Sequence, residues 1–212
     1  AGRAAEGPGH YAIGRGYLAL ADYDQALGHL EAAWAGEYRT PETAYALGLV
    51  MGALYQRELK KAERIEDQGQ REARRKELQK KYGEAALAYL KQSGETGGET
   101  PEYAEGLIAF YEGRYQEAQS LAERVAGRAL WMYEARYLQG EILAAQAFEK
   151  RRKGDYEGAL AELASAESAI LAGIRIGQSD PRGYGALCDL RVEIATTVHG
   201  GGGGEIRTTV DK

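Results

Sequence analysis

Apolar and small side chains recur along this chain in two short patterns. In the first, tyrosine stands three residues before glycine, at Tyr11–Gly14, Tyr45–Gly48, Tyr103–Gly106 and Tyr137–Gly140. In the second, an aromatic residue that follows a turn precedes alanine by three positions, and the pairs are Tyr23/Ala26, Tyr82/Ala85, Tyr115/Ala118 and Tyr156/Ala159. Two antiparallel helices approach closely only where a side chain is small or missing. The patterns therefore predict a series of helix-turn-helix units that stack on one another.

The spacing between the two patterns predicts hairpins of unequal length. From the tetrad glycine to the turn there are 7 residues in the first and third units (14 to 21 and 106 to 113), 14 in the fourth (140 to 154) and 32 in the second (48 to 80). The second unit thus carries an insertion of 25 residues, rich in helix formers and interrupted only at 67–69. We expect both of its helices to be elongated into a protruding hairpin, by about 12 residues or ~18 Å per arm.

In this register the two patterns resemble the tetratricopeptide repeat, whose roughly 34-residue consensus has L-G in its first helix, a G-x-Y turn and an alanine that opens its second helix. The matching positions are Ile13, Gly14, Tyr17, Tyr23, Ala26, Leu30 and Ala33 in the first unit and Gly106, Gly113, Tyr115, Ala118 and Val125 in the third. The resemblance covers about residues 10–170. It implies an all-α, right-handed solenoid of about four helical hairpins and a terminal helix, with the second repeat elongated.

The predicted organisation is a linker at 1–9, a repeat domain at 10–198 and a glycine-rich break with a tail at 199–212. The units lie at about 10–40, 41–92, 101–127 and 129–172, and a terminal helix follows at 181–198. The stretch 93–100 is expected to be a flexible loop before Pro101, which suits the first turn of a helix. Residues 205–212 are either a tail or the truncated start of a further helix.

Three segments carry a narrower similarity. GRGYLALADYDQALGHLEAAW at 14–34, YRTPETAYALGLVMGALYQREL at 38–59 and GLIAFYEGRYQEA at 106–118 are similar to the repeat region that trails the catalytic domain in a group of bacterial serine/threonine protein kinases. This similarity implies a sensing or substrate-docking module rather than the kinase itself. It also implies a cytoplasmic location, in a parent protein that is soluble or membrane-tethered.

Composition supports the helical prediction, because strong helix formers dominate and runs of Val, Ile and Thr are nearly absent. The net charge of −5 does not favour general polyanion binding. The insertion at 56–81 holds ten Lys and Arg against six Asp and Glu, a net charge of +4. This charge would suit an acidic or phosphorylated partner. The simpler interpretation is a solvated helix face, because positive and negative residues alternate along the insertion. Nucleic-acid binding is disfavoured because no aromatic residues interleave the cations, and no apolar stretch approaches the roughly 18 residues of a membrane span.

No motif in the chain points to catalysis. The G-x-G at 14–16 lacks a third glycine and a preceding strand, and no HRD-like or DFG-like segment occurs. The three histidines, His10, His29 and His199, lie far apart without metal-ligand spacing, so we expect no metal site and no cofactor. His29 is expected to be solvated on a helix surface, and Cys188 to be a small packed residue rather than a nucleophile.

The candidate partner-binding residues come from the resemblance. In the tetratricopeptide family the first helix of each repeat lines a concave groove, and its register maps onto Tyr11, Arg15, Leu18, Tyr45, Leu49, Tyr103, Leu107, Phe110, Tyr137 and Glu141. A ladder of phenols suits an extended or helical peptide. Alternatively, the tyrosines wedge adjacent helices apart and set the curvature of the solenoid, and the two roles are compatible.

We therefore predict a non-catalytic scaffold that captures a protein or peptide in the concave groove. The groove register lacks the Lys/Asn set with which family members clamp the C-terminal carboxylate of a chaperone, so a chaperone-tail receptor is disfavoured. The alternative is a structural or self-assembling spacer, joined through the long hairpin or the ends of the solenoid. An enzyme ranks third.

Overall fold

The computed structural model describes residues 6–94 and 101–201, and the regular elements in these ranges are all helices, without a strand. The elements in chain order are α1 (Glu6–Ala19), α2 (Tyr23–Ala35), α3 (Pro41–Ala62), α4 (Gln68–Leu78), the π-helical η2 (Gln79–Gly83), α5 (Glu84–Ser93), α6 (Pro101–Tyr111), α7 (Tyr115–Arg128), α8 (Tyr133–Arg152), α9 (Tyr156–Ile176) and α10 (Pro181–Gly201). The predicted all-helical class is confirmed. The chain forms two compact units, residues 1–121 and 122–212, with the boundary inside α7.

Local sequence explains where the helices begin. The carboxylates of Asp22, Asp67 and Asp155 cap α2, α4 and α9 by accepting a hydrogen bond from the backbone N–H three residues later. The Thr40 hydroxyl does the same for α3. Proline opens α3, α6 and α10, where its missing N–H costs nothing because that donor has no partner within the helix. These six helices therefore start at a residue that satisfies or removes an unpaired donor, whereas α8 starts after Met132 without a side-chain cap.

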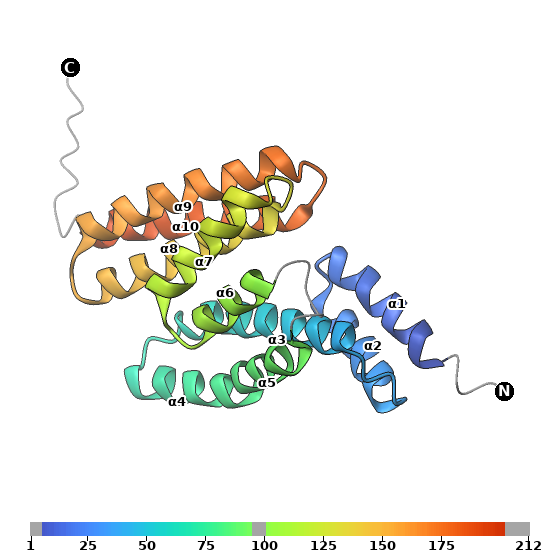
Figure 1. Ribbon diagram of the computed structural model, residues 1–212. Coiled ribbons are helices and arrows are strands. Elements are labelled where there is room, and N and C mark those ends of the chain that lie inside the picture. The colour runs from blue at the N-terminus through green and yellow to red at the C-terminus, as the bar shows by residue number, and fades with distance from the viewer. Residues whose placement is uncertain (1–5, 95–100, 202–212) are drawn as a thin grey trace, which may run out of the picture. The chain divides into compact units, whose positions relative to one another are not determined.

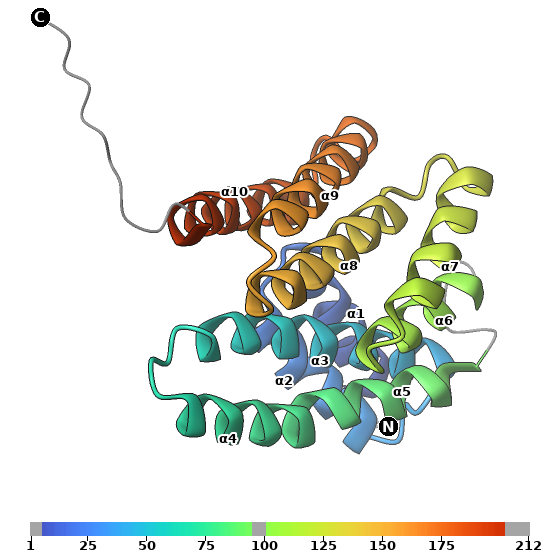
Figure 2. The same ribbon diagram turned by 90° about the vertical axis from the view of Figure 1, so that its left-hand side faces the viewer.

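The first unit is built from paired helices. α1 packs along α2, α2 contacts α3, and α3 packs along α5. Figure 2 shows that α3 runs antiparallel to the continuous α4–η2–α5 helix. The turn at residues 63–67 joins the two. The core of this unit is apolar, and its buried members are Leu18, Ala26, Leu30, Ala46, Leu47, Val50 and Leu54.

The second unit contains the long pair α8 and α9, with α10 packed mainly along α9 (Figure 1). Its buried apolar members are Ala147, Ala159, Leu163, Ala166, Ile170 and Leu190. Leu187 and Ile194 of α10 pack against this cluster and leave the opposite side of α10 exposed. The fold of this unit is thus a hairpin covered by one further helix.

One packing contact recurs in three hairpins. A Cβ atom on Gly14 would lie 2.7 Å from Leu30 Cγ, one on Gly48 would lie 2.7 Å from Leu90 Cγ, and one on Gly140 would lie 2.5 Å from Ile170 Cγ1. In each case the glycine belongs to the first helix of the hairpin and the aliphatic residue to the second. The missing side chain is therefore what allows the two helices to approach, as the sequence pattern predicts.

The turn between the helices also recurs. Ala21, Gly113 and Gly154 have the left-handed φ values of 58°, 77° and 82°. At each, the following N–H donates to a carbonyl five residues earlier, with N–O distances of 3.0 Å (Asp22 to Tyr17), 2.8 Å (Arg114 to Ala109) and 3.0 Å (Asp155 to Lys150). This is the Schellman-type helix ending. In the second hairpin the corresponding KKY sequence lies inside η2, because the chain turns at 63–67 instead.

Some boundaries differ from the sequence prediction. α1 begins at Glu6, so residues 6–9 are helical rather than part of a linker. α10 continues to Gly201, beyond the predicted end at 198. The break in the long hairpin lies at 63–67 rather than 67–69, since the Asp67 cap already starts α4. The predicted loop at 93–100, apart from Ser93 and Gly94, and the segment 205–212 lie outside the described residues.

Replacing Gly14 by alanine tests the recurring contact. The new Cβ would overlap Leu30, so we expect the free energy of unfolding to fall by about 1–3 kcal/mol. Gly16 on the same helix is the matched control, because a Cβ there meets nothing within 4 Å and Gly16→Ala should stabilise the helix by roughly 0.5–1 kcal/mol. Urea unfolding followed by circular dichroism measures both. Equal effects of the two substitutions would contradict the packing argument.

Ala21 offers a second test, because a non-glycine residue at φ 58° is strained. Ala21→Gly should raise the free energy of unfolding by about 1 kcal/mol, because glycine adopts the left-handed conformation without the steric strain of a Cβ atom. Ala12→Gly, at an exposed position inside α1, serves as the control and should lower it by about the same amount. A loss of stability in Ala21→Gly would show that the turn does not need a left-handed residue.

Candidate functional site

The ten predicted groove residues lie on the first helices of the hairpins. Three are on α1, two on α3, three on α6 and two on α8. Six of them are buried: Leu18 (7% exposed), Tyr45 (6%), Tyr103 (8%), Leu107 (4%), Phe110 (4%) and Tyr137 (7%). Side chains with so little exposed area offer almost no surface to a ligand. These six side chains are packed in the described structure, because apolar and aromatic side chains on these helices are drawn into contact with neighbouring helices.

Tyr137 illustrates the packing role of the tetrad tyrosine. Its ring occupies the space that a side chain on Gly173 of α9 or Gly183 of α10 would need. A Cβ atom on Gly173 would lie 2.5 Å from Tyr137 Cε1, and one on Gly183 would overlap the phenol hydroxyl. Its hydroxyl oxygen is buried and finds no hydrogen-bond partner among the residues that the structure describes. Burial, assisted by the negative charge of Asp180, raises the pKa of Tyr137 to about 12. Tyr137 therefore acts as a wedge between α8, α9 and α10, which favours the alternative role that the sequence left open.

A polar cluster fastens the start of α10 next to this wedge. The Arg182 guanidinium lies 2.7 Å from a carboxylate oxygen of buried Asp180 and 3.2 Å from one of Glu134. It also lies over the ring of Tyr133, with its central carbon 5.9 Å from the centroid. Burial, followed by the charge of Glu134, raises the pKa of Tyr133. These contacts join α8 to α10, and their geometry is that of a structural anchor.

Four of the predicted residues remain accessible. In the first unit, Tyr11 and Leu49 are half-buried and both border the same core, while Arg15 is exposed. Arg15 donates to the Tyr11 hydroxyl across 3.4 Å, and the Tyr11 ring lies 5.6 Å from that of Tyr38. Among the described residues no carboxylate pairs with Arg15. In the second unit Glu141 is exposed.

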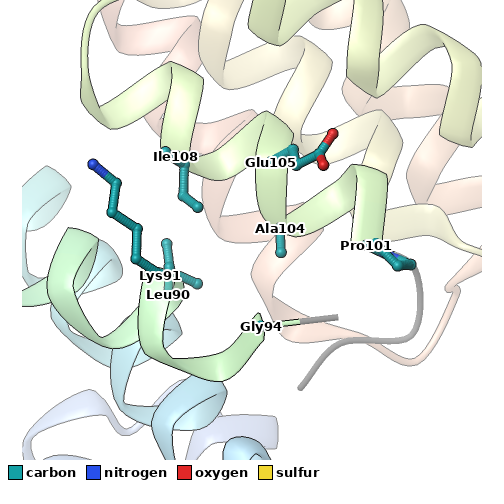
Figure 3. A pocket seen from close by; sticks show the side chains of 7 residues that line it. All are labelled: Leu90, Lys91, Gly94, Pro101, Ala104, Glu105 and Ile108. Atoms are coloured by element: carbon teal, nitrogen blue, oxygen red, sulfur yellow. The ribbon is translucent and has the colours of Figure 1, made fainter. Parts of the chain in front are cut away.

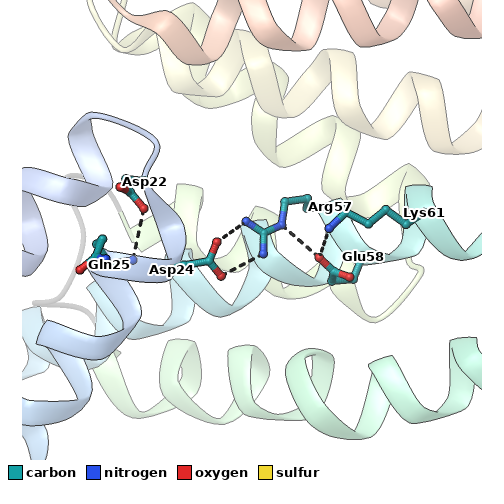
Figure 4. A network of polar contacts seen from close by, with 6 residues as sticks. All are labelled: Asp22, Asp24, Gln25, Arg57, Glu58 and Lys61. Carbon is teal, nitrogen blue, oxygen red and sulfur yellow. Dashed lines mark hydrogen bonds and ion pairs between the residues drawn. The ribbon is translucent and has the colours of Figure 1, made fainter.

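Carboxylates on the charged hairpin and on α2 pair with part of the positive charge of the hairpin. Arg57 makes two hydrogen bonds to the Asp24 carboxylate of α2, at 2.7 and 3.0 Å, and a third to Glu58 at 3.1 Å (Figure 4). Lys61 also donates to Glu58, at 2.7 Å. The bond from Arg57 lowers the pKa of Asp24, and the bond from Lys61 is the largest cause of the lowered pKa of Glu58. Such internal pairing supports the simpler interpretation of this insertion as a solvated helix face.

Two histidines that are distant in sequence meet in the first unit. His10 Nδ1 on α1 lies 2.9 Å from His29 Nδ1 on α2. The expectation that His29 is merely solvated is wrong, because hairpin closure places the imidazole against His10 and stacks it on Tyr17, with ring centroids 5.6 Å apart. No sequence signal could have found this pair, since 19 residues separate its members. The expectation for Cys188 is also wrong, because its side chain is exposed on α10.

A shallow hollow of about 270 Å³ lies between α5 and α6 (Figure 3). Leu90, Ala104 and Ile108 line it, and Lys91 at its edge pairs with Glu112 at 2.7 Å. Glu105 also lines it, and two further lining residues, Gly94 and Pro101, flank the segment 95–100, which lies outside the described residues. The hollow is smaller than ordinary ligand pockets, and we assign no ligand to it.

Within residues 6–94 and 101–201, no group of three or more His, Cys, Asp or Glu side chains could hold a metal ion. No helix in these ranges is long and apolar enough to cross a membrane. Comparison with protein-family models and with curated proteins gives no match to the sequence. The assignment of a function therefore depends on the geometry described above and on the repeat pattern.

The unpaired hydroxyl of Tyr137 generates a stability prediction. Tyr137→Phe removes a buried polar atom without a partner, so we expect the free energy of unfolding to rise by about 1 kcal/mol. Tyr184→Phe is the control, because the Tyr184 hydroxyl donates to the Gln178 carbonyl oxygen at 3.0 Å and its removal should be neutral or slightly destabilising. Thermal and urea unfolding measure both. A loss of stability in Tyr137→Phe would mean that the hydroxyl has a partner.

The same residue predicts a pH dependence. The pKa of Tyr137 is about 12 in the folded chain and roughly 10 in an unfolded one. As the pH rises, the unfolded state therefore loses the phenol proton first. The contribution of the protonated Tyr137 to the free energy of unfolding is complete below pH 10 and is lost as pH rises towards 12. We expect the unmodified chain to lose more stability over this range than Tyr137→Phe. Parallel pH profiles would contradict the assigned pKa shift.

Proposed function

We propose that this chain is a tetratricopeptide-like helical-repeat module that binds a protein or peptide partner and catalyses no reaction. The observation that supports it most directly is the contact between a glycine of the first helix and a large aliphatic residue of the second, at Gly14/Leu30, Gly48/Leu90 and Gly140/Ile170. A hairpin that recurs with one packing rule is the building principle of solenoids, and these serve mainly as binding surfaces.

The binding surface proposed here lies on α1 and α3 of the first unit. Tyr11 and Leu49 provide half-buried apolar area beside one core, and Arg15 provides an exposed guanidinium without a carboxylate partner among the described residues. Arginine binds a carboxylate through two parallel hydrogen bonds. The partner best suited to this surface is a peptide that places an apolar side chain near Leu49 and an acidic group at Arg15.

The cellular context is part of the same proposal. The segments at 14–34, 38–59 and 106–118 resemble the repeat region of bacterial serine/threonine kinases, which supports a sensing or docking module of a signalling protein. A right-handed solenoid formed by about four repeats, and a cytoplasmic location, belong to this proposal and have the same sequence support.

A self-assembling spacer is the second candidate function, and exposed apolar residues favour it. Ile13 and Leu20 on α1 are 48% and 70% exposed, and Val192 and Val198 on α10 are 58% and 53% exposed. Both helices thus present apolar area without a covering element among the described residues. Light scattering over a concentration series separates the candidates, because a strict monomer excludes self-assembly.

A peptide-display selection against the full chain tests the binding proposal. We expect selected peptides to contain an acidic residue near an apolar one, and Arg15→Ala combined with Leu49→Ala to weaken their binding at least about tenfold, or 1.4 kcal/mol. Fluorescence anisotropy with the selected peptides measures the affinities.

The matched control is Arg191→Ala combined with Leu171→Ala, which removes the same two residue types from exposed positions of the second unit. Its affinity should equal that of the unmodified chain. Selected peptides that bind equally to both double variants would contradict the proposed surface, and a selection without ligands would contradict the function.

A further inference from the structure

The His10–His29 pair places two ring nitrogens at hydrogen-bond distance. The two Nδ1 atoms lie 2.9 Å apart and the ring centroids 5.2 Å apart, so the nitrogens face one another between the rings. One imidazole donates its Nδ1–H and the other accepts, and both rings are half-buried. Two features hold them in place. The Gly14/Leu30 contact fixes α1 against α2, and Tyr17 stacks nearly parallel to His29, at 14°.

This arrangement has the dimensions of a metal-binding pair. Imidazole nitrogen binds Zn²⁺ at about 2.0–2.1 Å, so two nitrogens in neighbouring positions of one ion lie roughly 3 Å apart. The observed separation of 2.9 Å therefore suits one ion, and each ring turns until its lone pair points at the ion instead of at the other nitrogen. When the donor ring moves its proton from Nδ1 to Nε2, both rings stay neutral and both Nδ1 lone pairs become available. The ion then takes the place of the shared proton, and no proton is lost from the pair.

We propose that His10 and His29 form a two-histidine site for a divalent late transition-metal ion, with water in the remaining coordination positions. Imidazole ligands suit Zn²⁺, Ni²⁺ and Cu²⁺, and Cu²⁺ binds tightest in the general affinity order. Water completes the coordination because no third His, Cys, Asp or Glu joins the pair in the described part of the chain. The site differs from the proposed peptide surface in its contacts, since Tyr11 contacts Arg15 and Tyr38, whereas the histidines contact one another and Tyr17.

Calorimetric titration of the full-length chain with Zn²⁺ or Cu²⁺ salts at pH 7.5 tests this site. The exposed thiol of Cys188 is removed in all samples by Cys188→Ser, because thiolates compete for these ions. We expect one ion per chain and a metal-induced rise of the unfolding temperature. His10→Gln or His29→Gln should each weaken binding at least about tenfold and abolish the rise. His199→Gln, which changes the third histidine on α10, should leave both unchanged.

Two measurements keep the proposal open to contradiction even if a histidine variant folds poorly. Electron paramagnetic resonance of the Cu²⁺-loaded chain should show coupling to two imidazole nitrogens, which reads the ligand set without mutation at either histidine. The metal-induced rise of the unfolding temperature should also disappear when a chelator removes the ion. No binding at one equivalent, coupling to fewer than two nitrogens, or equal affinity in His10→Gln, His29→Gln and His199→Gln would overturn the proposal.

Discussion

Close approach of two helices at a glycine is the constraint on which the rest of this structure depends. Gly14, Gly48 and Gly140 each accept a leucine or isoleucine from the opposite helix at a distance that leaves no room for a Cβ atom. The contacting residues are 16, 42 and 30 positions apart in sequence, yet the contact itself does not change. The base of each hairpin is therefore set by one pair of residues, and the arms beyond it are free to vary in length. The elongated α3 and α4–η2–α5 helices are the longest arms of these three hairpins.

The same principle explains the tyrosines. A large aromatic side chain beside such tight contacts needs a space of its own, and in the second unit Gly173 and Gly183 provide one for Tyr137. The tyrosine then separates helices that the glycines allow to approach, so tetrad tyrosine and packing glycine work as a pair. The cost is a buried hydroxyl without a partner among the described residues. Among the ten predicted groove residues, Arg15 stays exposed and Leu49 half-buried, and the proposed binding surface includes both.

Packing of adjacent helices also brings together polar side chains that are far apart in the sequence. Asp24 and Arg57 meet across α2 and α3, and His10 and His29 meet across α1 and α2. The first contact neutralises charge on the long hairpin and ties it to its neighbour. The second brings two imidazole side chains to hydrogen-bond distance in a chain whose sequence has no metal-binding motif. The histidine pair follows from the close approach of α1 and α2 at Gly14, whereas the Asp24–Arg57 pair follows from the packing of α2 against α3.

The amino-acid sequence by itself determined the helical class, the register of the hairpins and the existence of the long insertion, because these depend on local propensity and on residue spacing. Helix formers, Asp caps and the small residue at the contact act within one or two helices. Burial is different, since it depends on what every neighbouring helix places around a side chain. Only the tertiary structure could therefore decide that Tyr45, Tyr103 and Tyr137 are packed, that Cys188 is exposed and that two histidines form a pair.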